Sequence, residues 1–343
     1  MAVTSGEYQK ILLVGPVKYT VSPWILLWAK NLRELGFTVR IFDPREAIRV
    51  LGVSFKNISP KIHSLAVRAM NRRLLQLAKR WKPELVLCLK GDLVYPSTIK
   101  KMSELGAITL LWFPDDPWLF YTIAREIAPA YDYVVTSSEK CVKWYKHIGC
   151  KHVKYLPFMC DPDIHKRVNL TEEERKYYGA DLCFVGSYAP ERERYFEVLC
   201  DYDFKIFGSG WDRARQKVRA KWMGRPLSIF EMVKAFNASK IVLNLHTAET
   251  KYGGMKANMR VFEATGCGAF HLADRTEGLS DLFILDKEVA VYDSKEELRE
   301  KVDYYLDNPE EREKIARRGQ ERAYKDHTFK KRIEELFEFI GTV

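Results

Sequence analysis

The chain has 343 residues, of which 47 % are hydrophobic and 30 % are charged. This composition excludes an intrinsically disordered chain, and the length favours two domains of comparable size. No apolar run approaches the roughly 20 residues that span a bilayer, and the polar first residues do not resemble a signal peptide. Seven scattered cysteines without a C-x-x-C pair favour free thiols over disulfides or a zinc site. We therefore expect a cytoplasmic protein.

The net charge of +10 lies entirely in the N-terminal half of the chain. Residues 1–165 hold 24 Lys and Arg against 14 Asp and Glu, whereas the remaining residues hold 32 of each sign. The excess is densest in residues 45–82, where ten basic residues accompany the single acid Glu46. This asymmetry favours an anionic partner for the first half, and the alternative is a solvated basic face.

In the first half, short apolar runs alternate with helical patterns, which predicts β-α units around a parallel sheet buried on both faces. The helical pattern over 62–81 is amphipathic and basic, typical of a helix that binds anionic lipid or an acidic polymer, or of an outer helix packed on its sheet. The predicted strands are Ile11–Val14, Phe37–Phe42, Leu85–Leu89, Ile108–Trp112, Tyr133–Thr136 and Val153–Leu156.

A polar stretch follows, and the alternation then restarts as a second α/β unit. The strands predicted there are Leu182–Val185, Phe204–Phe207, Ile241–Leu245 and Ala269–Leu272. We thus predict two Rossmann-like, doubly wound parallel-sheet domains that face a central cleft, with ligands at the carboxyl ends of the strands. The predicted segments are an N-terminal domain over 1–160, a linker over 161–180, a C-terminal domain over 181–325, and a helix over 326–343 that packs back on the first domain.

Two glycine-containing turns follow the first two strands of the second half. Gly186 and Ser187 form a small turn that lets backbone N–H groups approach a phosphate, with Arg192 close behind in the sequence. After the next strand, Gly208, Gly210 and Trp211 are typical of a turn that admits a ligand, with a ring that stacks on a base. The alternative for both is an ordinary tight turn.

The run from His246 to Gly268 holds the highest density of residues suited to a nucleotide. Its glycines precede a helix that we expect to begin after the N-cap Asn258, and a helix N-terminus beside lysines holds phosphate. Arg260 is suited to a phosphate, and Glu263, three residues later, to a ribose diol. The predicted binding residues here are Gly253, Gly254, Lys256, Asn258, Arg260 and Glu263.

Asp115 and Asp116 lie between prolines and aromatic residues, just after a strand of the first half. One of them could act as a general base or contact a substrate. The alternative is a helix N-cap with Pro117 at the first helical position, so a catalytic role and a capping role stay open. His246, at the start of the glycine-containing run suited to a nucleotide, completes the catalytic candidates.

Several of these segments resemble the CgeB-like, spore-maturation type of glycosyltransferase. The resemblance is strongest over about 181–332 and includes Asn258–Phe270, Phe184–Ser187 with Arg192, and Ile241–His246. It extends to Tyr304–Leu306, Glu311 and Arg312, His327–Phe329 with Arg332, Lys90–Asp92 and Trp112–Pro117. The resemblance implies the GT-B fold and a metal-independent transferase whose nucleotide-sugar donor lies mainly on the C-terminal domain.

The larger group of retaining GT-B enzymes, which this family resembles, has a Glu, seven spacers and a second Glu in its donor site. Glu263 matches the second position, whereas the first is Met255, so the donor sugar and the retaining or inverting outcome stay open. We expect no metal site and no cofactor besides the donor, taken as UDP-linked. The expected acceptor is an anionic glycan or a lipid-linked molecule, with peripheral membrane contact through the basic half.

Two other classes of function compete with a glycosyltransferase. A nucleotide-sugar epimerase or hydrolase could use the same fold, because a fold does not fix its chemistry. A non-catalytic protein that retains the fold could bind a polyanion through the basic face, although nucleic acid is the less favoured partner.

Overall fold

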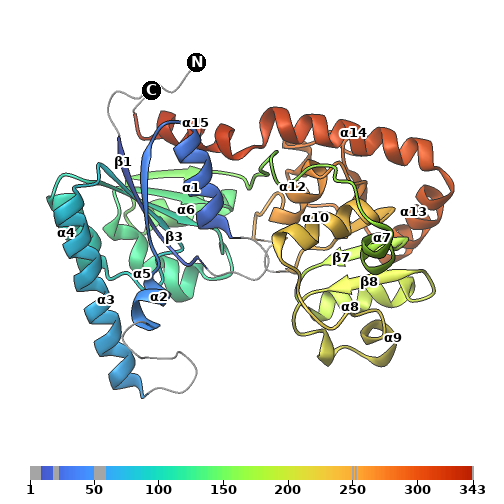
Figure 1. Cartoon of the computed structure of the whole chain (residues 1–343), viewed down its shortest axis with the longest axis horizontal. Helices are drawn as coiled ribbons and strands as arrows, with labels where there is room; N and C mark the ends of the chain where they lie inside the picture. The colour runs from blue at the N-terminus through green and yellow to red at the C-terminus, as the bar shows by residue number, and fades with distance from the viewer. Residues whose placement is uncertain (1–8, 18–22, 50–58, 249–250, 252, 342–343) are drawn as a thin grey trace. The chain divides into compact units, whose positions relative to one another are not determined.

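The computed structural model describes residues 9–17, 23–49, 59–248, 251 and 253–341. The chain forms two compact units, one around Pro23–Leu156 and one formed by Pro157–Lys331. Each unit is an open parallel sheet with helices on both faces (Figure 1). Within the described ranges no helix is both long enough and apolar enough to cross a membrane.

The first unit holds a six-stranded parallel sheet with the order β2-β1-β3-β4-β5-β6. Its strands are β1 (Lys10–Val14), β2 (Thr38–Phe42), β3 (Leu85–Leu89), β4 (Ile108–Phe113), β5 (Tyr133–Thr136) and β6 (His152–Tyr155). All six lie within about a residue of the apolar runs that predicted them. These runs are continuous because the central strands are buried on both faces, as in most parallel sheets.

The helices of the first unit pack on both faces of this sheet. Leu74, Ile99 and Tyr145, from three different helices, share one hydrophobic core with alternate residues of the strands. On the other face the ring of Trp28 packs edge-on against Trp112 of β4, with 5.5 Å between centroids. The elements are α1 (Trp24–Glu34), α2 (Pro44–Arg49), α3 (Pro60–Trp81), α4 (Pro96–Glu104), η1 (Phe120–Ala124), α5 (Arg125–Ile127), η2 (Ala128–Ala130) and α6 (Glu139–His147).

The second unit holds a five-stranded parallel sheet with the order β11-β10-β9-β7-β8. Its strands are β7 (Leu182–Val185), β8 (Phe204–Phe207), β9 (Ile241–Asn244), β10 (His271–Asp274) and β11 (Ala290–Tyr292). The strand β10 begins and ends two residues later than its apolar pattern predicts. This shift places Asp274 at the carboxyl end of the strand, where the sequence pattern had not put it.

The helices of the second unit begin at recognisable capping residues. Ser228 and Ser294 accept hydrogen bonds from the backbone N–H groups of Glu231 and Glu297, and Asn258 caps its helix as predicted. The elements are α7 (Glu172–Tyr178), α8 (Pro190–Phe196), η3 (Glu197–Leu199), η4 (Trp211–Arg213), α9 (Gln216–Arg219), α10 (Ile229–Ala238), α12 (Met259–Gly266), η5 (Leu279–Asp281), α13 (Lys295–Asp307) and α14 (Pro309–Asp326).

The chain passes from the first unit to the second after Leu156 and returns to the first unit after Lys331. The stretch predicted as a linker, 161–180, contains helix α7, whose N-cap Thr171 and Glu174 form a capping box, and it belongs to the second unit. The last helix, α15 (Phe329–Phe339), belongs to the first unit from Arg332 onward. There Phe337 stacks on Phe37 with 4.9 Å between ring centroids, and Lys154 donates a hydrogen bond to the backbone of Glu335.

Candidate functional site

The predicted donor motifs gather at one point of the second sheet. The strands β7 and β9 are neighbours, and the chain continues to β8 on one side and to β10 on the other. Such a reversal of strand order opens a crevice at the carboxyl ends of the two strands, where doubly wound sheets bind ligands. Gly186 and Ser187 follow β7 directly, and His246 follows β9. The site is therefore built around this switch point.

Arg260, on the first turn of α12, reaches across to the end of β7. Its Nε donates to the backbone oxygen of Val185 and its Nη1 to Oδ1 of Asn244, while its guanidinium lies 4.4 Å from the centroid of the Phe184 ring. A side chain at position 186 would place its Cβ 2.4 Å from Nη2 of Arg260, so glycine lets the guanidinium group lie directly against the turn. Burial, and then the nearby Arg192, lower the pKa of Arg260 to about 9.

Arg192, on α8, approaches the same ring. Its Nε donates to the backbone oxygen of Leu245 at 3.0 Å, its Nη1 donates to that of Ser187 at 2.7 Å, and its guanidinium lies 5.2 Å from the Phe184 centroid. Burial lowers its pKa to about 10. Among the described residues, no carboxylate lies within ion-pair distance of Arg192 or Arg260. Their hydrogen-bond acceptors are neutral, so neither guanidinium group has a carboxylate in direct contact, although the more distant Asp274 attracts both charges.

His246 lies beneath this pair, buried and bonded through both ring nitrogens. Its Nδ1 is 2.8 Å from Oδ1 of Asp274, and its Nε2 accepts a hydrogen bond from the backbone N–H of Asn258 at 2.9 Å. The neutral ring with its proton on Nδ1 satisfies both bonds. The structure thus places this catalytic candidate as a support for the N-terminus of α12.

Asp274 and Asn244 are the residues of this site that the sequence analysis did not single out. Asp274 also accepts from the backbone N–H of His246 and from Asn244, whose Oδ1 in turn accepts from Asn258. Burial works to raise the pKa of Asp274, but His246 and Lys251 outweigh it and hold the pKa below its usual value. Asn244 and Asp274 are each the polar residue that ends the observed strand, but the predicted strands end at Leu245 and at Leu272, so the sequence pattern did not mark either position.

The second glycine turn packs against the first. At Gly208 the backbone φ is +151°, and a Cβ would lie 1.9 Å from the backbone oxygen of Gly186, while Gly210 has a φ of +81°. Trp211 is fully buried, stacks on Phe196, and donates its indole N–H to the same backbone oxygen at 2.8 Å. The ring therefore fastens one turn to the other and belongs to the core, instead of presenting a face to a base.

The remaining predicted binding residues are held by neighbours within the second unit. Lys256 pairs with Asp281 at 2.6 Å, and its aliphatic stem lies where a Cβ of Gly278 would be. Glu263 is buried on α12, with one carboxylate oxygen 4.0 Å from Nε2 of His165. Gly254 has a φ of +84° in the loop that leads to α12, and Gly253 precedes it. Arg192 and Arg260 are thus the predicted cations left for an anion.

The aspartate pair of the first unit divides into one accessible and one buried carboxylate. Asp115 pairs with Lys90 at 2.7 Å and is partly exposed. Asp116 is fully buried, and its Oδ2 accepts from Thr136 at 2.6 Å and from Tyr145 at 2.9 Å. Burial raises the pKa of Asp116 to about 7, although these two hydrogen bonds act in the opposite direction.

Neither aspartate caps a helix at Pro117, contrary to the capping alternative. The residues after Asp116 form turns, and the first helical segment, η1, begins at Phe120 with Leu119 at its N-cap. The reason is the inward direction of the Asp116 side chain, whose hydrogen bonds to Thr136 and Tyr145 take the carboxylate away from the backbone N–H groups. Of the two, Asp115 is the carboxylate that an acceptor could reach.

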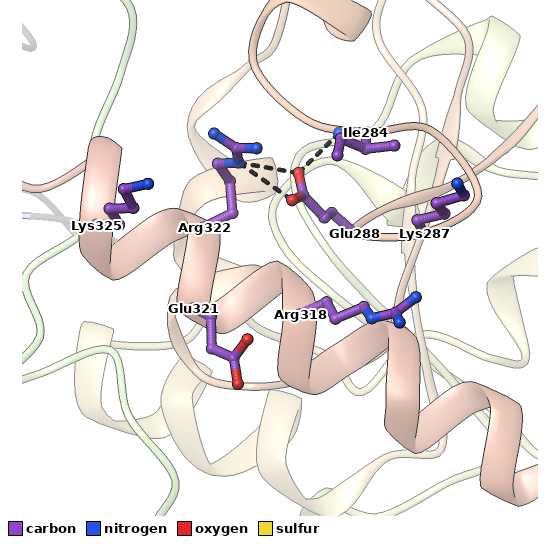
Figure 2. Close-up of a pocket in the computed structure, with 7 residues that line it drawn as sticks. All are labelled: Ile284, Lys287, Glu288, Arg318, Glu321, Arg322 and Lys325. Carbon is purple, nitrogen blue, oxygen red and sulfur yellow. Dashed lines mark hydrogen bonds and ion pairs between the residues drawn. The ribbon is translucent and has the colours of Figure 1, made fainter.

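A separate pocket of about 370 Å³ lies between α14 and the loop before β11 (Figure 2). Figure 2 shows that Glu288 accepts hydrogen bonds from Arg322 and from the backbone of Ile284, while Glu321 points away from them. Its charged groups therefore do not converge on one point. No group of three His, Cys, Asp or Glu side chains that could hold a metal ion occurs in the described part of the chain.

Comparison with known proteins agrees with this geometry. Residues 191–338 match the family model described as "Glycosyl transferase-like". The structure is similar to sucrose-phosphate synthase from Thermosynechococcus elongatus, with a TM-score of 0.67, 11 % identity, and coverage of 97 % of this chain and 99 % of that one. It is also similar to HepE from Anabaena in complex with UDP-glucose, with a TM-score of 0.62, 11 % identity, and coverage of 97 % and 100 %.

The two doubly wound units and the structural matches define the class of fold, which is GT-B, and the second unit carries the match to the glycosyltransferase-like family model. In particular, the chain is similar to the spore protein CgeB of Bacillus subtilis. The two are 22 % identical over 261 residues, which cover 71 % of this chain and 78 % of that protein. The resemblance to CgeB-like glycosyltransferases that the sequence motifs indicated is therefore confirmed.

Proposed function

We propose that this chain transfers a sugar from a UDP-linked donor, whose diphosphate is bound by Arg192 and Arg260 at the switch point of the second unit. The observation that carries this proposal is the pair of guanidinium groups on Phe184 without a carboxylate partner. Two like charges held this close favour a bound anion, because an anion relieves their repulsion. The UDP-glucose complex of HepE, a protein of the same fold, supports a uridine diphosphate as that anion.

The arrangement is suited to stabilising a departing diphosphate. Negative charge develops on the leaving phosphate oxygen as the glycosidic bond breaks, and fixed cations lower the energy of that state. Hydrogen bonds to the backbone of Val185, Ser187 and Leu245 hold both guanidiniums in place before the donor arrives. Because this positive charge comes from side chains, we propose that transfer is independent of a divalent metal.

The buried chain Asp274–His246–Asn258 keeps the N-terminus of α12 in register with the arginines. Asn258 caps α12 through the backbone N–H of Arg260, and His246 holds the backbone of Asn258. A fixed helix N-terminus adds partial positive charge near the diphosphate. In this proposal His246 is a positioning residue, and it does not transfer a proton to or from the substrate.

The acceptor is assigned to the first unit, which carries the whole net charge of the chain. Asp115 is the carboxylate placed to contact it, at the carboxyl end of β4 and bound to Lys90. Asp116 supports this loop from below through Thr136 and Tyr145. An anionic acceptor, such as a phosphate-bearing glycan or a lipid-linked glycan, matches the charge of this unit.

Calorimetric titration of the purified chain with UDP and UDP-glucose tests this function. We expect saturable binding that EDTA does not abolish, and transfer products that appear only when a glycan acceptor is added. Release of free sugar or of an epimerised nucleotide sugar without an acceptor would instead identify a hydrolase or an epimerase. A chain that binds neither nucleotide would contradict the proposal, as would turnover that requires added Mn²⁺ or Mg²⁺.

A further inference from the structure

We propose that the exposed face of helix α3 docks this protein onto an anionic lipid bilayer. The proposal concerns a surface of the first unit that is separate from the donor site, and it does not depend on the transfer reaction. It rests on three properties of α3: a complete core face, an outer face of unpaired cations, and two exposed aliphatic side chains at its start.

The inner face of α3 is fully used by the fold. Val67, Met70, Leu74, Ala78 and Trp81 are buried: the first two belong to one hydrophobic cluster, and the last three belong to the larger core of the first unit. Asn71 also fastens the helix, since it donates to the backbone oxygen of Leu93 and accepts from the backbone N–H of Tyr95. The packing of the unit therefore explains the inner face, whereas the outer face packs on no core cluster of the described residues.

The outer face is a uniform stripe of cations. Six basic residues and no acid occur in α3, and Lys82 adds a seventh basic residue at its C-cap. The six are exposed, and none makes an ion pair with another described residue, whereas the exposed Arg317 of α14 pairs with Glu321 of the same helix. They are Lys61, Arg68, Arg72, Arg73, Lys79 and Arg80.

The start of α3 carries aliphatic side chains where a solvated helix would carry polar ones. Ile62 is 51 % exposed and Leu65 is 64 % exposed, and the buried positions of the helix begin only at Ala66. Positions about seven residues apart lie nearly in line along a helix, so Leu65 shares one stripe with Arg72 and Lys79. In Figure 1 this end of α3 points away from the sheet.

Aliphatic side chains in line with cations favour a lipid surface over a soluble polyanion. Basic residues are attracted to anionic headgroups, and aliphatic side chains at the same face enter the boundary with the acyl chains. A nucleic acid or an acidic polysaccharide would use the cations alone, and it offers no apolar phase to Ile62 and Leu65. From the positive charge of this face we infer that the lipid headgroups are anionic. From the two exposed aliphatic residues we infer that the partner is a lipid surface and not a soluble polyanion.

Sedimentation of the full chain with lipid vesicles tests the proposal. We expect binding to vesicles of phosphatidylcholine with about one third phosphatidylglycerol, and little binding to pure phosphatidylcholine. The triple change Arg68→Gln, Arg72→Gln and Arg73→Gln should weaken binding on the order of 100-fold, because each cation near the surface contributes about fivefold. The double change Ile62→Ala and Leu65→Ala should weaken it roughly tenfold.

Two matched variants control for general effects of charge and apolar area. The triple change Lys217→Gln, Arg219→Gln and Arg318→Gln removes the same charge from exposed positions of the second unit. Leu105→Ala removes an aliphatic side chain that is 53 % exposed, outside α3. Neither control should change vesicle binding more than about twofold, and UDP titration should be the same for every variant.

Three outcomes would overturn the proposal. Equal binding to the anionic and the neutral vesicles would exclude the headgroup assignment. Equal loss from the two triple variants would show that net charge, and not α3, determines binding. If the double aliphatic variant still bound vesicles as well as the unchanged chain, this face would be a site for polyanions in general. Competition by heparin or RNA would then measure its affinity for such polyanions.

Discussion

The carboxyl edges of the two sheets differ in whether their basic side chains are paired with a carboxylate. At the edge of the second sheet, Arg192 and Arg260 bond only to neutral acceptors, although residues 166–343 as a whole carry no net charge. At the edge of the first sheet, Lys90 is neutralised by Asp115, although that half carries all of the net charge. Net charge thus indicates which half meets an anionic partner over its surface, whereas local pairing indicates where a small anion binds.

The largest expected effect is on nucleotide affinity, and it sharpens this comparison. Arg260→Gln should weaken UDP binding about 100-fold, because truncating one partner of a half-buried charge pair costs roughly 2–5 kcal/mol. Arg260→Lys keeps the charge but loses the forked geometry, so its affinity for UDP should lie between those of the unchanged chain and the Gln variant. Isothermal titration calorimetry with UDP measures both.

Arg194→Gln is the matched control for this experiment. Arg194 lies on α8, two residues after Arg192, but it is exposed. Its substitution removes the same charge from the same helix, so UDP affinity should stay within about twofold of the unchanged chain. Equal losses from the Arg194 and Arg260 variants would show that the unneutralised pair is not the anion site.

The two units should also respond to pH with opposite signs. In the second unit, burial lowers the pKa of His165 to about 4 from an ordinary value of 6.5. As the pH falls, His165 therefore takes up its proton at a higher pH in the unfolded chain than in the folded one. Its contribution to the free energy of unfolding is complete above pH 6.5 and is lost as the pH falls through 4. In the first unit, the pKa of Asp116 is raised to about 7 from 3.8, so stability present below pH 3.8 is lost as the pH rises through 7.

Hydrogen exchange measured by mass spectrometry separates the two responses. Between pH 6.5 and 4, peptides of α12 should lose about 3 kcal/mol of protection through His165, at roughly 1.4 kcal/mol per pKa unit, and peptides of β4 should gain protection. His165→Asn keeps an acceptor for the backbone N–H of Asp161 and should remove the loss. Asp116→Asn should remove the gain, and a pH response common to both units would contradict this assignment.

A tenfold effect on UDP affinity is expected from a change of His246, which holds the N-terminus of α12. His246→Ala removes the acceptor that holds the backbone of Asn258, so the N-terminus of α12 should loosen and UDP affinity should fall about tenfold, a typical cost for one buried hydrogen bond. His246→Gln places an amide oxygen near the position of Nε2 and should restore most of the affinity. A general base would respond differently, because the Gln variant would then bind UDP normally but lose turnover.

The smallest effect is expected at Lys256. Asp281 already neutralises this lysine at 2.6 Å, so Lys256→Gln should change UDP affinity less than about threefold. Asp281→Asn removes this ion pair and should leave the affinity equal or slightly higher. A loss near 100-fold in the Lys256 variant, measured by the same titration, would mean that the lysine turns to the phosphates when the donor binds.

Sequence patterns located the strands well because a strand buried on both faces needs an unbroken apolar run. Leu85–Leu89, Leu182–Val185 and Phe204–Phe207 were predicted to the residue. Gly186, Arg192 and Arg260 are three of the predicted site residues that the structure brings together. Their convergence follows from the rule that loops after parallel strands meet at one edge of the sheet.

The directions of single side chains were not accessible from the sequence. Trp211 turns into the core because Phe184 and Phe196, both distant in sequence, provide its packing surface. His246 is held by Asp274, 28 residues away, and the pairing depends on β9 and β10 being neighbours in the sheet. Strand order is a property of the assembled sheet, so no local pattern records it.

The end of α15 has a consequence for the order in which this protein is made. The first unit begins the chain, yet the rings of Phe337 and Phe339 pack on Phe37 and Tyr133 of that unit. A ribosome adds about 5–20 residues each second, so these aromatic surfaces wait at least ten seconds or so for their covering. The first unit is thus completed by residues of α15, which are synthesised after the whole of the second unit.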